Sequence, residues 1–158
     1  MKVLTTGDVY CAAAAGTCYF ESWQGVALAE HYQEQWDHQK AFVRELGGAR
    51  MVSISYIVGV KLTPPSQEAR KVLNDRATDM EKHMSAAAIV IPVGGVAPII
   101  VRGVLATMKL LTRSEMPTEV FRDLDVACVW IAELAKPPLV ASELYEAANT
   151  FLALTKRA

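Results

Sequence analysis

The sequence lacks a run of basic residues and carries little net charge. Lysine and arginine number 16 against 17 aspartates and glutamates, which gives a formal net charge of -1. This balance provides no electrostatic reason to expect a nucleic acid as a ligand. Hydrophobic residues make up 52% of the 158 residues, which excludes a disordered tail. A chain of this length has room for one domain with its own core and not for two of ordinary size.

Cysteine is scarce, and a catalytic set of side chains is missing. Cys11, Cys18 and Cys128 are odd in number and lack metal-binding spacing, so we predict neither a disulfide framework nor a structural metal site. Cys128 lies in an apolar segment with no histidine nearby, whereas a reactive thiolate needs a polar, electropositive setting. Ser53 and Ser55 occur without a nucleophile elbow around them. We therefore expect a protein that is not an enzyme and needs no cofactor.

An uninterrupted hydrophobic run is also missing. The most apolar stretch, IPVGGVAPIIVRGVLATMKLL, extends from residue 91 to 111, and prolines and adjacent glycines interrupt it, with Arg102 close to its centre. A span of about 20 residues must satisfy every backbone group within lipid, so we expect no membrane span. The glycines match neither GxGxxG nor GK[ST], so they do not predict a phosphate-binding loop. They favour a tight turn between a strand and a helix over residues 97–112.

The amino terminus lacks the apolar core of an export signal. Such a signal needs about 7 to 15 consecutive apolar residues, and TTGD at residues 5–8 interrupts the only candidate. The segment instead favours two short strands, residues 8–13 and 17–23, joined at a turn that contains Gly16. Together with the unpaired cysteines, this pattern predicts a protein of the reducing cytoplasm.

The rest of the chain alternates between helical and strand periodicity. Apolar residues at spacings of three and four predict further helices over residues 26–46, 64–84, 123–134 and 140–156. Alternating or continuous β-branched runs predict strands over residues 51–58, 86–93 and 117–121. This order predicts an α/β domain: a mixed β-sheet with helices mainly on one face, and one helix added at the carboxyl end.

A group of potential metal ligands lies on the first of these helices. His31, Glu34 and His38 recur at i, i+3 and i+7, which places them along one side and makes a metal site conceivable. The residues around them are charged or carry amides, which favours a solvated face instead. We expect no metal.

The carboxyl-terminal half resembles a known family. The stretch VRGVLATMKLLTRSEMPTEVFRDLDVACVWIAEL is similar to bacterial STAS-like domains, relatives of the anti-sigma factor antagonists, in which a helix of small apolar residues leads through a proline-containing link to a short strand. An alanine and a tryptophan three residues apart follow that strand, here Ala127 and Trp130. The resemblance implies one STAS-like domain over residues 1–136, with Trp130 buried against the sheet, and residues 137–158 as an amphipathic helix packed on the domain or on a second copy.

The resemblance also draws attention to two hydroxyls. In phosphorylated antagonists a strand runs into an Asp-Ser-Ser-Gly-like turn, and the serine that opens the next helix accepts the phosphate. The equivalent region here, VGVKLTPPSQEAR, lacks that motif. Ser66 is the nearest hydroxyl and Thr63 the second. A helix cap is the favoured role for them, and a phosphorylation switch is the alternative, because a helix amino terminus tolerates a phosphate.

Two classes of function fit these sequence features. The first is a non-enzymatic regulatory module that binds another protein, or itself, through exposed helix faces. The second is a carrier or sensor that holds a small apolar ligand between the sheet and the helices. Because the last helix has an apolar side that must be buried somewhere, we expect a homodimer. Its predicted contact includes Leu144, Phe151 and Leu154, with the helix that contains Arg102 as the other candidate surface.

Overall fold

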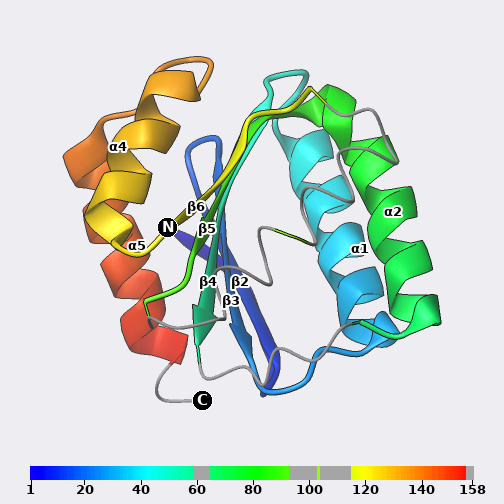
Figure 1. The fold of residues 1–158 in the computed structure, drawn as a ribbon. Helices are drawn as coiled ribbons and strands as arrows, with labels where there is room; N and C mark the ends of the chain where they lie inside the picture. Colours follow the sequence, from blue (N-terminus) through cyan, green and yellow to red (C-terminus); the bar gives the residue numbers. More distant parts are fainter. Residues whose placement is uncertain (59–64, 93–102, 104–114, 156–158) are drawn as a thin grey trace.

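The computed structural model describes residues 1–58, 65–92, 103 and 115–155. It contains a six-stranded sheet, with α1 and α2 on one face and α4 and α5 on the other (Figure 1). The strands are β1 (Lys2–Thr6), β2 (Tyr10–Ala15), β3 (Cys18–Gln24), β4 (Met51–Val58), β5 (Met84–Val90) and β6 (Thr118–Phe121). The helices are α1 (Ala29–Glu45), α2 (Gln67–Met80), α4 (Leu124–Leu134) and α5 (Ala141–Thr155), with a short 3-10 helix η1 (Glu81–His83) before β5.

The sheet is mixed. Its strands lie in the order β1-β2-β3-β4-β5-β6; β1, β2 and β3 pair antiparallel, whereas β3 to β6 pair parallel. The β2–β3 hairpin pairs Ala15 with Cys18, and Gly16 in its two-residue turn has a φ of 56°, which glycine adopts without strain. Parallel neighbours need a crossover connection, and α1 and α2 provide it for β3–β4 and β4–β5.

The sequence patterns do not predict β1, which forms one edge of the sheet. Its residues are exposed or half-buried, and they do not alternate between apolar and polar, so periodicity gives no signal. Its pairing with β2 shifts register between Val3 and Thr5. Lys2 forms an ion pair with Glu45 at the end of α1, with Nζ and Oε1 2.8 Å apart.

The predicted α/β class and mixed sheet are confirmed, but the described helices do not lie mainly on one face. They divide two and two, because the central strands bury side chains in both directions. Cys18 and Phe20 of β3 pack toward α4 and α5, whereas Tyr19 and Trp23 of the same strand pack toward α1 and α2. A strand that is buried on both faces needs cover on both.

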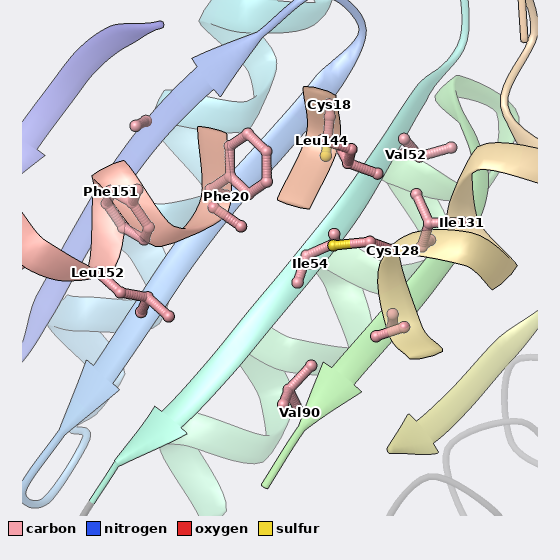
Figure 2. Packing of buried hydrophobic residues seen from close by; sticks show 14 of the residues in the cluster. Cys18, Phe20, Val52, Ile54, Val90, Cys128, Ile131, Leu144, Phe151 and Leu152 are labelled. Atoms are coloured by element: carbon pink, nitrogen blue, oxygen red, sulfur yellow. The ribbon is translucent and has the colours of Figure 1, made fainter. Parts of the chain in front are cut away.

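The space between the sheet and α4 and α5, which we call the apolar layer, is filled by hydrophobic side chains and thiols (Figure 2). Phe20 of β3 and Phe151 of α5 lie with ring centroids 6.2 Å apart, and Cys128 and Ile131 of α4 are fully buried beside Ile54. Helix α5 therefore packs back on its own sheet, the first of the two arrangements that the sequence left open.

Trp130 is only half-buried, in contrast to the expectation that it lies buried against the sheet. Its ring packs against Phe121 of β6, with centroids 5.4 Å apart. Strand β6 is short and lies at the end of the described sheet, so it covers only part of the indole.

Helix α2 begins at Gln67, later than predicted, with Ser66 as its N-cap. Thr63, Arg102 and, apart from Gly103, the predicted helix over residues 97–112 lie outside the described residues. Within the part of the chain that the structure describes, no helix is both long and apolar enough to cross a membrane.

Candidate functional site

Ser66 caps α2 at its exposed amino end. Its hydroxyl oxygen accepts a hydrogen bond from the Ala69 amide at 3.1 Å, which satisfies one of the helix's free donors. The side chain is therefore engaged in helix capping and also partly exposed to solvent. Thr63, the second candidate hydroxyl, cannot be placed because it lies outside the described residues.

The predicted contact residues on α5 separate into two kinds. Leu144 and Phe151 are 4% and 3% exposed and belong to the apolar layer, so the folded domain does not present them to a second copy. Leu154 is 39% exposed and remains at the surface. Arg102, on the other predicted surface, lies outside the described residues.

The histidines of α1 have local partners. The Leu28 amide donates to Nδ1 of His31 at 3.0 Å, which closes the first turn of the helix. Nε2 of His38 lies 3.5 Å from Glu34, and Glu34 also accepts a hydrogen bond from Thr5 at 3.2 Å. In the described ranges, no three His, Cys, Asp or Glu side chains gather as a metal site would require.

The three cysteines are free thiols buried in the apolar layer. Burial raises the pKa of the Cys128 thiol to about 11 and that of Cys18 well above its ordinary value. Burial also raises the pKa of Cys11, whose Sγ donates to the Gly7 carbonyl. A thiol with a raised pKa is protonated at neutral pH and is a poor nucleophile.

The other face of the sheet holds buried polar side chains. We call this space, between the sheet and α1 and α2, the polar layer; its buried polar residues are Glu21, Gln35, Gln39 and Ser53. Glu21 on β3 is only 2% exposed. Its carboxylate accepts the amide of Gln35 on α1 at 2.6 Å and the hydroxyl of Ser55 on β4. In the described part of the chain, no basic side chain forms an ion pair with it.

Two hydrogen bonds join α1 and α2 above the sheet. Nε of Arg76 on α2 donates to Oε1 of Gln39 on α1 at 2.8 Å, and the Trp36 indole donates to Asp79 at 2.9 Å. Gln39 is fully buried, whereas Arg76 is half-buried. Two amide atoms of this layer, Oε1 of Gln35 and Nε2 of Gln39, are buried without a hydrogen-bond partner.

Two tyrosine hydroxyls meet beside Glu21. Tyr10 on β2 and Tyr19 on β3 share a hydrogen bond, and burial raises the pKa of both phenols. The carboxylate of Glu21 raises these pKa values further, while the guanidinium of Arg76 lowers them. The same two charges act in the same opposite directions on the pKa of Tyr32. Glu21 and Arg76 therefore act on one shared set of hydroxyls.

Sequence patterns alone did not identify the polar layer. Glu21 lies in a strand with aromatic neighbours, where a charged residue is expected to face solvent. A signal was nevertheless present, because Gln35 and Gln39 are four residues apart and fall on the same side of α1 as Phe42, the side that is buried. Three residues of this side are buried, and two of them carry amides.

The outer surface of α4 has a different character. Val126 and Val129 are each 51% exposed, and as i and i+3 neighbours they lie on one side of the helix with half-buried Trp130. Exposed acids predominate around them. Between residues 122 and 155 the exposed charged side chains are Asp123, Asp125, Glu133, Glu143 and Glu146 against Arg122 and Lys136.

Comparisons with known proteins bear on the fold. No family model matches the sequence, and no curated protein matches it. Among solved structures, the chain is similar to an uncharacterized protein of the DUF3478 family with a SpoIIAA-like fold, from Shewanella loihica PV-4. The TM-score is 0.53 at 12% sequence identity, and the match covers 82% of this chain and 94% of that chain. The resemblance to STAS-like domains is thus confirmed for the fold.

Proposed function

We propose that this protein is a non-enzymatic regulatory module that binds another protein through the outer surface of α4. The observation that carries this proposal is the exposed valine pair, Val126 and Val129. Two large aliphatic side chains half open to water on one side of a helix form the kind of apolar patch that protein contacts bury. Single exposed apolar residues elsewhere need no such explanation.

The charges around the valines support a partner of stated chemistry. Asp125 and Glu133 lie beside the pair, and acids outnumber bases on α4 and α5. An apolar patch with an acidic rim fits a surface with apolar residues at its centre and lysine or arginine around them. We therefore expect a partner protein with a basic, amphipathic surface.

Other features support the non-enzymatic part of the proposal. The three thiols are buried and their pKa values are raised, and Ser55 donates its hydroxyl to Glu21 rather than facing a base. Three free thiols in one core also support a reducing compartment such as the cytoplasm.

The predicted homodimer, with its expected contact on α5, is retained as the alternative. Two of its expected contact residues, Leu144 and Phe151, lie in the apolar layer, which leaves Leu154 as the exposed one. Two copies that meet through their acidic surfaces would repel each other. We therefore expect a different protein, and sedimentation of the purified chain tests the homodimer directly.

The experiment compares two double variants as baits in native cell extract. Val126→Ser with Val129→Ser removes the proposed contact, and Val3→Ser with Val58→Ser removes two valines that are 44% and 38% exposed on strands. We expect a protein that the parent and the control variant capture and the α4 variant loses. Capture should weaken as salt is raised, because charges at the rim are screened. Equal capture by both variants would contradict the proposal.

A further inference from the structure

The polar layer holds two opposite charges that do not touch. The carboxylate of Glu21 is buried on β3 with Gln35 and Ser55 as its hydrogen-bond donors, and the guanidinium of Arg76 reaches down from α2 to Gln39. Neither charge has an ion-pair partner within the described ranges. A buried carboxylate without a cation is costly, since desolvation is compensated only by neutral donors.

Each of the two glutamine amides has one atom without a hydrogen-bond partner: an acceptor on the amide that contacts Glu21 and a donor on the amide that contacts Arg76. Oε1 of Gln35, a hydrogen-bond acceptor, belongs to the amide that already donates to Glu21, so the negative end of the layer offers acceptors. Nε2 of Gln39, a donor, belongs to the amide that accepts from Arg76, so the positive end offers donors. Both glutamine residues are at least nine-tenths buried. A buried donor or acceptor without a partner costs about 1–3 kcal/mol.

Small side chains flank Glu21 on the sheet beneath these groups. Ala12 and Ser55 lie opposite Glu21 on the neighbouring strands, and Ser53 and Ala87 are paired one step along. Trp23 lies toward one end of the layer and Met51 and Met80 toward the other, and the rings of Tyr10 and Tyr19 enter it beside Glu21. On the sheet side, the middle of the layer thus combines small residues with two phenol hydroxyls, and on the helix side it has the polar groups of Gln35, Gln39 and Arg76.

We propose that the polar layer binds a small zwitterion of the amino-acid class. The ammonium group of the ligand is held by Glu21 and Oε1 of Gln35, and its carboxylate is held by Arg76 and Nε2 of Gln39. A single buried water would satisfy the two amide atoms but would leave both charges unpaired. A ligand with both charges pairs each of them and satisfies both amides at once. This site is separate from the protein-binding surface proposed on α4.

Binding is tested on the full chain with a series of amino acids of increasing charge separation: glycine, β-alanine, γ-aminobutyrate and 5-aminovalerate. Acetate and methylammonium, each with one of the two charges, serve as single-charge probes. We expect at least one member of the series, at about 10 mM, to raise the melting temperature and to give saturable heat in calorimetry, since a ligand that binds only the folded state stabilises it. The single-charge probes should have little effect.

Variants locate the site. Glu21→Gln and Arg76→Gln each remove one charge and should weaken binding about tenfold or more, the loss typical of a charged hydrogen bond. Arg70→Gln is the matched control, because Arg70 is exposed on the same helix and donates to the Pro65 carbonyl; it should bind as the parent does.

Three results would overturn the proposal. They are the absence of a shift with every member of the series, equal stabilisation by a single-charge probe, and binding that survives both charge variants. If the variants unfold, the comparison of zwitterions with single-charge probes on the parent protein still decides the question. A failed result here leaves the partner-capture experiment unaffected.

Discussion

The two faces of the sheet are covered by layers of opposite character. The apolar layer under α4 and α5 contains aromatic rings, aliphatic side chains and protonated thiols, with Phe20, Ile54 and Phe151 among its largest members. The polar layer under α1 and α2 contains aromatic rings and methionines as well, but a carboxylate and two amides lie among them. Both layers rest on the same strands, because consecutive residues of β3 and β4 point to opposite sides.

The requirement for a stable fold explains the composition of the apolar layer but not that of the polar layer. Burial of apolar area accounts for the apolar layer without further explanation. The same reasoning does not explain the polar layer. Replacing buried ionic groups by apolar residues of similar volume is often neutral or stabilising, so stability alone does not favour polar groups there. Its composition therefore requires another explanation, and the proposed zwitterionic ligand supplies one.

The largest effect on this comparison should come from truncating the centre of the apolar layer. Phe151→Ala removes a ring that packs on Phe20 and should lower the free energy of unfolding by about 3–5 kcal/mol, through lost burial and a cavity. Urea unfolding measures the change. Leu154→Ala on the same helix is the control, because Leu154 is exposed and its loss should cost far less. Similar losses for the two variants would mean that α5 does not pack as described.

The apolar layer should also weaken at alkaline pH. Burial raises the pKa of the Cys128 thiol from 9.0 to about 11, so the folded state holds its proton more tightly than the unfolded state. That stabilisation is complete below pH 9 and is lost as the pH rises through about 11, with a loss of up to about 2–3 kcal/mol. Cys128→Ala should show a shallower decline over this window. Tyr10 and Tyr19 contribute to the decline in both proteins, so only the difference between the two proteins reports on Cys128. An identical decline would contradict the assignment to Cys128.

The free energy of unfolding should depend on which residue replaces Glu21 in the polar layer. Glu21→Ala leaves the Gln35 amide and the Ser55 hydroxyl without their acceptor and should cost about 1–3 kcal/mol in the free energy of unfolding. Glu21→Gln retains an acceptor and should cost less. Chemical denaturation of both variants measures the contrast, and a Glu21→Ala protein as stable as the parent would show that this network is not formed.

The smallest effect is expected at the amino end of α2. Ser66→Ala removes the cap of the Ala69 amide and should cost about 1 kcal/mol, while capture of the partner stays unchanged. Thermal and urea unfolding measure the cost. A loss of capture that Ser66→Asp restores would instead favour the phosphorylation switch.

Periodicity predicts most elements of this fold because their residues follow the period of a helix or of a strand. The strand over residues 51–58 is observed with those bounds, and the helices over residues 123–134 and 140–156 are observed within a residue or so of theirs. Edge strand β1 escapes such reasoning, because its residues do not alternate between apolar and polar. Periodicity also does not predict that helices lie on both faces, because the sequence of a strand does not indicate which helix packs on which face of the sheet.

The candidate sites were predicted less well than the fold, for a physical reason. Leu144 and Phe151 were correctly predicted to be buried residues of an amphipathic helix, but amphipathicity does not tell whether the chain itself or a second copy provides the cover. Glu21 and Arg76 are 55 positions apart, and only the crossover through α1 and α2 brings them into one layer. Charges that come together through topology leave no local pattern to detect.

The register shift in β1 has a consequence for the protein at high concentration. An edge strand exposes unpaired amides and carbonyls to other chains, and a flat edge allows two sheets to pair edge to edge and aggregate. The irregularity between Val3 and Thr5 distorts the local ladder, and Lys2 places a charge where an incoming strand would lie. These two features disfavour the addition of another strand at this edge, which matters in a chain with 52% hydrophobic residues.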